Sequence, residues 1–257
     1  MEQEYFDITQ FGLLLIDIGA SLQSAGASSS RIRITMERFA QARQLKSHFV
    51  IGPKSIAVTL ISANGVTEFT GLHSSAAAGV NFKLLSGLSR LSWRFVEEPM
   101  TIQQVRDELS RLTSLPHYPR WLSLIMVSLA GAAFCFTFGG DAKQMCITFI
   151  ATFFGLFVNQ ELKKNKFNPY LCTYVSATTA ALVTALFFAA GLNLRLAHAY
   201  STCVLFLIPG VPLINAFSDL IDGEILHGLE RGTNALLHTL AIAAGLSTIL
   251  MIFNIQA

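Results

Sequence analysis

Residues 121–138 read WLSLIMVSLAGAAFCFTF, a run of apolar and small residues that carries no charge. An α-helix rises about 1.5 Å per residue, so a helix of this length nearly crosses the hydrocarbon core of a bilayer, which is about 30 Å thick. Four further uncharged runs follow it along the chain. Together the runs predict five spans of a lipid bilayer, at residues 121–138, 144–160, 167–194, 196–218 and 232–257.

The charged residues are distributed unevenly along the chain. Only 13% of the 257 residues are charged, against about 25% in ordinary soluble domains. Of the 34 charged residues, 22 lie in residues 1–120, although this is the shorter part. We therefore expect a water-exposed domain at residues 1–115 and a membrane domain at residues 119–257. A net charge of +2 without a basic block gives no reason to expect a nucleic-acid partner.

The charges between the spans predict how the chain lies in the membrane. Lys163, Lys164 and Lys166 follow the second span, and short basic loops lie preferentially on the cytoplasmic side. This orientation places residues 1–115 in the cytoplasm. Because the number of spans is odd, the C-terminus is expected outside.

The N-terminal domain mixes helical and strand patterns. Apolar residues recur at helical spacing from Phe11 to Ala25, and the serines from Ser28 onward supply a cap for a second helix. The Asn64-Gly65 pair predicts a hairpin between two strand-like segments. The expected elements are helices at about 11–25 and 28–39, strands at 55–62 and 66–70 with 48–51 as a candidate third strand, and helices at 80–95 and 101–113. The fold class is therefore an α-helical polytopic membrane protein with an N-terminal cytoplasmic α+β domain.

No motif in the sequence points to catalysis. The chain has no nucleophile-elbow sequence, no glycine-rich phosphate loop and no metal-ligand spacing. Its four cysteines lie in apolar stretches and suit packing. We expect no catalytic residue, no metal ligand and no cofactor, and the chain is not expected to be an enzyme.

The fourth span is interrupted. Residues 205–219 read LFLIPGVPLINAFSD, where Pro209, Gly210 and Pro212 disfavour a continuous helix. Broken backbone at membrane depth is tolerated only where it packs in protein or lines an aqueous cavity. Pro212 suits the first position of a new half-helix, whose free amides would favour a carboxylate. The break is therefore a candidate substrate site.

Polar residues continue from the break. Asn215 and Asp219 lie one helical turn apart. A carboxylate near a membrane cavity is a candidate proton carrier, because desolvation favours its protonated form. Arg231 is expected either to neutralise Asp219 or to bind a substrate carboxylate. The alternative is a simple kink followed by a solvated cytoplasmic loop.

The segment also carries a recognisable motif. It reads Pro209-Gly210-x-Pro212-x-x-Asn215-x-x-x-Asp219-x-x-x-Gly223-x-x-x-x-Gly228-x-x-Arg231. This motif resembles the signature of the bacterial threonine/serine exporter family. The resemblance extends to Pro119-Arg120-Trp121 before the first span and to Gly26-Ala27 in the N-terminal domain.

The resemblance implies a function and a partner. At this length the chain is similar to the larger subunit of the split form of that family, whose relatives are implicated in succinate export. It implies a smaller membrane subunit as partner, an oligomeric assembly and a place in the bacterial inner membrane. The chain is thus expected to be a subunit of a secondary transporter that exports small carboxylates, either threonine and serine or a dicarboxylate, with Asp219 coupling export to protons.

Two alternatives remain open at the level of sequence. In the first, the soluble domain is the active part of a membrane-anchored enzyme or signalling module. Five spans with an internal break are more than an anchor needs. In the second, this chain is a structural or regulatory subunit, and its partner carries the transport pathway.

Overall fold

The computed structural model describes residues 7–62, 64–75, 79–116, 118–190 and 197–254. The chain forms two compact units, which are described separately. The first contains Met1–Pro116 together with Val211–Gly232, and the second contains His117–Gly210 and Thr233–Ala257. A segment far along the sequence therefore belongs to the N-terminal unit, and the chain leaves the second unit between Gly210 and Val211.

The first unit opens with two helices, α1 (Ile8–Ser24) and α2 (Ser29–Ala42). The Asp7 carboxylate caps α1 by accepting hydrogen bonds from the amides of Thr9 and Gln10. The Ser28 hydroxyl caps α2 by accepting from the amide of Arg31. These caps satisfy amides that have no partner inside the helix. The Ser28 cap confirms the sequence prediction.

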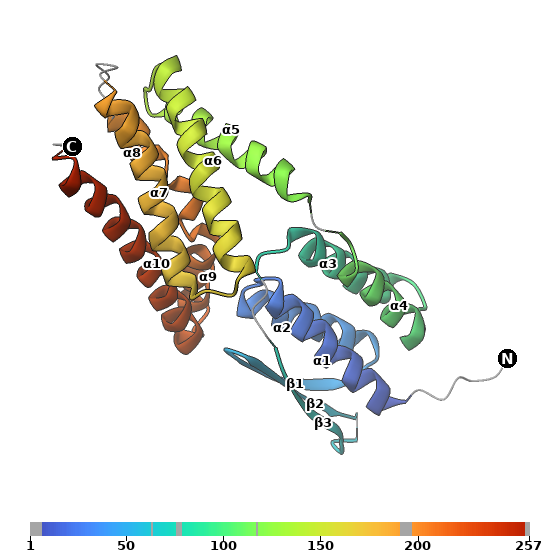
Figure 1. Ribbon diagram of the computed structural model, residues 1–257. Coiled ribbons are helices and arrows are strands. Elements are labelled where there is room, and N and C mark those ends of the chain that lie inside the picture. Colours follow the sequence, from blue (N-terminus) through green and yellow to red (C-terminus); the bar gives the residue numbers. More distant parts are fainter. Residues whose placement is uncertain (1–6, 63, 76–78, 117, 191–196, 255–257) are drawn as a thin grey trace. The chain divides into compact units, whose positions relative to one another are not determined.

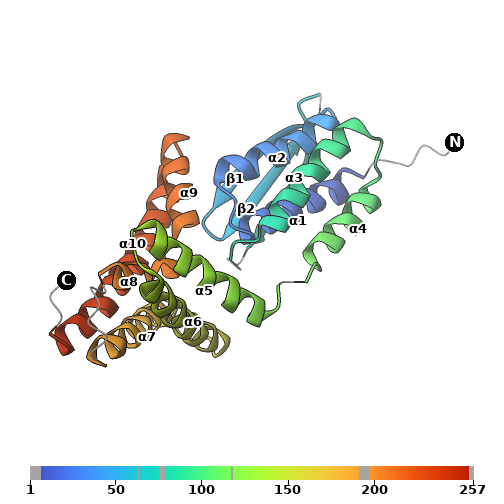
Figure 2. The ribbon, with the colours of Figure 1, turned by 90° about the horizontal axis from the view of Figure 1, so that it is seen from above.

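The strands form an antiparallel sheet in the order β1 (Lys46–Gly52), β2 (Ser55–Ile61), β3 (Thr67–Ser74). Alternate residues of β2 are buried, namely Ile56, Val58 and Leu60. The period of two places them all on one face, and α1 and α2 cover that face (Figures 1 and 2). The hairpin and its third strand are as predicted, with a register irregularity between Leu60 and Ile61.

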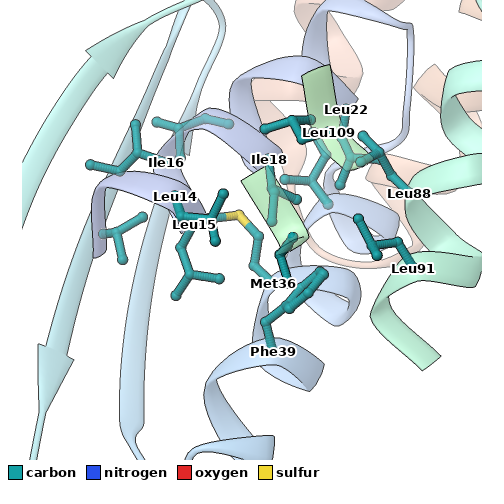
Figure 3. Packing of buried hydrophobic residues seen from close by; sticks show 14 of the residues in the cluster. Leu14, Leu15, Ile16, Ile18, Leu22, Met36, Phe39, Leu88, Leu91 and Leu109 are labelled. Carbon is teal, nitrogen blue, oxygen red and sulfur yellow. The ribbon is translucent and has the colours of Figure 1, made fainter. Parts of the chain in front are cut away.

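Helices α3 (Phe82–Glu97) and α4 (Ile102–Thr113) complete the core of the unit. Thr101 and Gln104 form a reciprocal capping box at the start of α4, as their spacing predicts. Asn81 caps α3, so this helix begins slightly later than the predicted residue 80. Apolar side chains of the four helices pack against one another in the core of this unit (Figure 3). The labelled residues include Leu22, Met36, Leu88 and Leu109.

The structure confirms the membrane helices. Among the residues that the structure describes, four helices are long and apolar enough to cross a membrane, namely α5 (Arg120–Thr137), α6 (Ala142–Lys164), α7 (Pro169–Ala189) and α10 (Ile225–Ile252). A fifth candidate is the pair formed by Ala197–Leu207 and α9 (Gly210–Ile221), which is bent by 65° at its break. Ala197–Leu207 comprises the short helix α8 (Ala197–Thr202) and a 3₁₀ turn, η1 (Leu205–Leu207). The predicted fourth span is therefore broken.

Small residues let the helices of the second unit approach closely. A Cβ atom on Gly155 would lie 3.1 Å from the carbonyl oxygen of Ser176, and one on Gly245 would lie 2.8 Å from that of Tyr174. The buried Asn159 amide also donates to the Ser176 hydroxyl over 3.1 Å. Close backbone approach and interhelical hydrogen bonds of this kind hold helices together where lipid supplies no hydrophobic driving force.

Two helix boundaries differ from the sequence prediction. Helix α10 begins at Ile225, seven residues before the predicted span at 232, so only a short turn at 222–224 separates it from α9. Similarly, α6 runs on through Lys163 and Lys164. Counting uncharged residues locates the apolar part of a span, whereas the helix itself continues into charged residues where water or protein solvates them. The junction between the third and fourth predicted spans, at residues 194–196, lies outside the described residues.

Candidate functional site

The end of α9 and the start of α10 form a tight helical hairpin in the first unit. Gly223 has a φ of 83°, and the amide of Glu224 donates to the carbonyl of Asp219 over 2.8 Å. This is the 6→1 hydrogen bond of a Schellman turn, which favours glycine at its left-handed position. A Cβ on Gly228 would lie 2.9 Å from the carbonyl oxygen of Ala216, so only glycine fits where the helices touch.

The segment that faces this hairpin is the turn between α1 and α2. It is a second Schellman turn, in which Gly26 has a φ of 83° and the amide of Ala27 donates to the carbonyl of Leu22 over 3.1 Å. The carbonyls of Gly26 and Ala27 lie beyond the last hydrogen bond of α1. They remain available as acceptors for other parts of the chain.

Two side chains of the hairpin bind these carbonyls. The Asn215 amide nitrogen donates to the carbonyl of Gly26 over 2.8 Å. Nη2 of Arg231 donates to the carbonyl of Ala27 over 2.9 Å. The two hydrogen bonds therefore link residues that are 189 and 204 positions apart in the sequence.

A third contact places a carboxylate at the start of α2. The amide of Ser29, the first residue of the helix, donates to Oδ1 of Asp219 over 3.0 Å. Asp219 and Ser29 are both fully buried. The positive end of the helix dipole and a free amide both stabilise an anion at this position. We call Asn215, Asp219, Arg231 and the 26–29 turn the clamp.

The clamp contains a buried charge pair. Nη1 of Arg231 lies 3.0 Å from Oδ2 of Asp219, and the two side chains are 18% and 0% exposed. The two atoms are close but not aligned for a hydrogen bond, and neither has another hydrogen-bond partner among the described residues. The contact is therefore mainly electrostatic. The buried Ser29 hydroxyl also has no hydrogen-bond partner among the described residues.

A second ion pair lies next to the clamp. Nη2 of Arg33 in α2 lies 2.5 Å from Oε1 of Glu224 in the α9–α10 turn. Nδ1 of His227 lies 3.7 Å from the other oxygen of Glu224. This pair is partly exposed, with side-chain exposures of 36% for Arg33 and 29% for Glu224. It joins helix α2 to the same α9–α10 hairpin.

The structure brings only part of the predicted site together. Asn215, Asp219 and Arg231 converge on the 26–29 turn. Pro209 and Gly210 belong to the second unit, and Pro212 is the third residue of α9, two residues later in the helix than the predicted first position. The alternative of a solvated loop does not describe Asp219, which is 0% exposed.

Sequence reasoning missed two residues of this region, Ser29 and Arg33. The available signal was the Gly26-Ala27 pair, which combines a helix-stop glycine with a following serine cap and so indicates a helix N-terminus free to bind an anion. No cluster of His, Cys, Asp or Glu suited to a metal ion occurs in the part of the chain that the structure describes. Chemically, the clamp is a place where one carboxylate is held by a helix amide and a guanidinium.

These features define a class. The chain is a polytopic helical membrane protein with an N-terminal α+β region, a broken membrane helix and a buried charge pair beyond the break. The family follows from the sequence, since the profile described as "Putative threonine/serine exporter" (ThrE) matches residues 13–253. The chain belongs to the threonine/serine exporter family.

Individual relatives cover the chain to different extents. It is 28% identical to the "Probable succinate transporter subunit YjjP" of Escherichia coli K12 over 95% of this chain and 94% of that protein. The protein of the same name from Klebsiella aerogenes is also 28% identical, over 90% of each chain. The "Probable threonine/serine exporter" of Mycobacterium tuberculosis is 24% identical over 91% of this chain but only 44% of its own length. No solved structure matches the chain.

Proposed function

We propose that this chain is the larger subunit of a two-subunit secondary transporter that exports small carboxylates across the bacterial inner membrane. The observation that carries the proposal is the end-to-end match to two proteins named succinate transporter subunits, whereas the M. tuberculosis exporter is about twice as long. Both of these relatives are named subunits, and a smaller membrane subunit of the same family fits the role of the partner. The substrate class is a dicarboxylate of the succinate type, with threonine and serine as the other candidates.

The proposed orientation follows the loop charges. Lys163 and Lys164 end α6, and Arg120 at the start of α5 donates hydrogen bonds to Gln160 and Glu161 near the same end. A basic and polar layer at this end of α5 and α6 favours the cytoplasmic side. The N-terminal region then lies in the cytoplasm and the C-terminus outside.

We place the substrate near the break, with Pro209, Gly210 and Pro212 shaping the backbone and Asn215, Asp219 and Arg231 supplying polar contacts. Asp219 is the proposed proton-coupling residue. Both of its partners, the Ser29 amide and the Arg231 guanidinium, bind the ionised carboxylate. A proton on Asp219 would weaken both contacts, so proton uptake would be linked to release of the clamp.

The test is efflux from intact cells. Cells preloaded with radiolabelled succinate, threonine or serine would express this chain together with the smaller subunit, this chain alone, or the smaller subunit alone. The variants are Asp219→Asn and Asp222→Asn, compared at matched membrane abundance. Asp222 is an exposed carboxylate in the α9–α10 turn, so its variant controls for loss of a negative charge at this position in the chain.

We expect one substrate to leave faster only when both subunits are present. Asp219→Asn should abolish this gain and Asp222→Asn should retain it. Efflux by this chain alone would refute the two-subunit proposal. Normal efflux by Asp219→Asn would be compatible with the exporter proposal but would refute Asp219 as its proton-coupling residue.

A further inference from the structure

The clamp has the composition of a carboxylate-binding site. A guanidinium and the first amide of a helix are two of the strongest carboxylate-binding groups in proteins. Here both lie against one carboxylate, that of Asp219: the Ser29 amide donates to Oδ1 over 3.0 Å, and Nη1 of Arg231 lies 3.0 Å from Oδ2. The chain thus supplies both the binding site and the anion that occupies it.

The site has more binding capacity than Asp219 uses. The Ser29 hydroxyl is buried and has no hydrogen-bond partner among the described residues. Nη1 of Arg231 and Oδ2 of Asp219 contact each other over 3.0 Å, but neither makes an aligned hydrogen bond in this part of the chain. Buried polar atoms are nearly always paired, because an unpaired one costs about 1–3 kcal/mol. The unused Ser29 hydroxyl and the misaligned contact of Arg231 with Asp219 indicate that a second ligand could satisfy these donors better.

We propose that Asp219 is a built-in competitor for the transported carboxylate. A substrate carboxylate would take the place of Asp219 on the Arg231 guanidinium and the Ser29 amide, with the Ser29 hydroxyl as an additional donor. This inference rests on the proposed function only in taking the ligand to be a small carboxylate. It assigns Arg231 and Ser29 to ligand binding. It gives Asp219 the role of holding the site closed, in place of the direct substrate contact proposed for this residue above.

Replacement of Asp219 by a substrate carboxylate would weaken the attachment of the α9–α10 hairpin to the 26–29 turn. Asp219 and a substrate carboxylate carry like charges, so both cannot share one buried guanidinium without strong repulsion. When Asp219 leaves, the α9–α10 hairpin loses its central attachment to the 26–29 turn. The hydrogen bonds from Asn215 to Gly26 and from Arg231 to Ala27 are the remaining ones within the clamp. Binding of the ligand is thereby converted into a change in how the hairpin is held.

The direction in which Asp219→Asn changes the affinity for succinate distinguishes this mechanism from direct binding of the ligand by Asp219. If Asp219 competes with the ligand, Asp219→Asn should bind succinate more tightly than wild type. A ligand site that is free about one tenth of the time gains about tenfold in apparent affinity when its competitor is removed. If Asp219 instead contacts the ligand or its proton, the same substitution should weaken binding.

The experiment measures [¹⁴C]succinate binding to the purified full-length chain in lipid nanodiscs. The variants are Asp219→Asn, Arg231→Gln, the double substitution Asp219→Asn/Arg231→Gln, and the control Asp222→Asn. Folding of each is checked by circular dichroism and gel filtration. The double substitution leaves no unpaired buried charge, so it remains informative if Arg231→Gln alone fails to fold.

We expect about tenfold tighter binding for Asp219→Asn, loss of at least tenfold for the double substitution relative to it, and no change for Asp222→Asn. Hydrogen exchange of the peptide covering residues 211–224 should rise when succinate binds the wild type. Weaker or unchanged binding by Asp219→Asn, or an undiminished affinity in the double substitution, would overturn the inference. Efflux without these changes in binding affinity would support the exporter proposal and refute the role of Asp219 as a competitor. The changes in affinity without efflux would support the carboxylate site and refute the exporter proposal.

Discussion

The Asp219–Arg231 pair makes a quantitative prediction about coupling. Arg231→Ala leaves a carboxylate that is 0% exposed with a single helix amide as partner. Removing one member of a buried ion pair in this way costs about 3–5 kcal/mol. Asp219→Ala should cost less, about 1.5–3 kcal/mol, because the remaining Arg231 side chain is 18% exposed and still donates to the carbonyl of Ala27.

The double substitution should cost less than the sum of the two single ones. It removes both charges, so neither is left buried and uncompensated. We expect the two single effects to exceed the double effect by about 2–3 kcal/mol, near the upper end for directly contacting residues. A coupling of this size would mean that the pair acts as one unit within the clamp.

The assay is amide hydrogen exchange of the 26–29 turn in the full-length protein. The amide of Ala27 is a suitable probe, because its acceptor is the carbonyl of Leu22 and neither substitution removes that partner. A loss of about 3 kcal/mol in local opening free energy accelerates exchange roughly 100-fold. Asp222→Ala, in the same turn region but exposed, should leave the rate unchanged. Strictly additive single effects would show that the two charges do not interact and would refute the buried pair.

Two further predictions concern the hairpin and its outer ion pair. Gly228→Ala should lower stability by about 1–3 kcal/mol, because its Cβ would lie 2.9 Å from the Ala216 carbonyl oxygen. The loss should appear as a lower midpoint in thermal unfolding. Gly232→Ala is the control, since its Cβ would lie 3.9 Å from the Ala216 Cβ. Equal midpoints for the two variants would argue against the close approach. Arg33→Gln and Glu224→Gln should each lower the free energy of unfolding by less than about 1 kcal/mol, because the ion pair is partly exposed. In about 1 M salt the two variants should be as stable as the wild type, because salt screens exposed charges. A larger loss that persists in salt would contradict the description of this pair as a weak surface contact.

Local patterns were sufficient to predict much of the fold. The helical spacing from Phe11 to Leu22, the alternation around Val58 and the capping box at Thr101 each reflect contacts within a few residues, and the structure confirms all three. The break after Pro209 was also local, since proline removes a backbone donor wherever it occurs. Helix boundaries near charged residues were less predictable, because a helix can continue beyond its apolar part.

The partners of Asp219 could not be predicted in this way. The contact between Ser29 and Asp219 joins positions separated by 190 residues, and no periodicity connects them. It depends on two glycine turns, at Gly26 and Gly223, that reverse the chain on either side of it. The sequence did contain those glycines, and it indicated that Asp219 and Arg231 are related. What it could not show is that their third partner is a helix N-terminus in the N-terminal α+β region.

The spacing of the motif has a structural explanation in the first unit. Asn215 and Asp219 lie one turn apart on α9, Gly223 reverses the chain, Gly228 permits close contact and Arg231 returns to the level of Asp219. A substitution at Asp219 therefore disturbs the attachment of the hairpin as well as any proton or substrate chemistry. Loss of efflux in Asp219→Asn would be expected from either effect, so efflux alone cannot distinguish them. Binding affinity can, because removal of a competitor is the one role of Asp219 for which its substitution strengthens binding of the carboxylate.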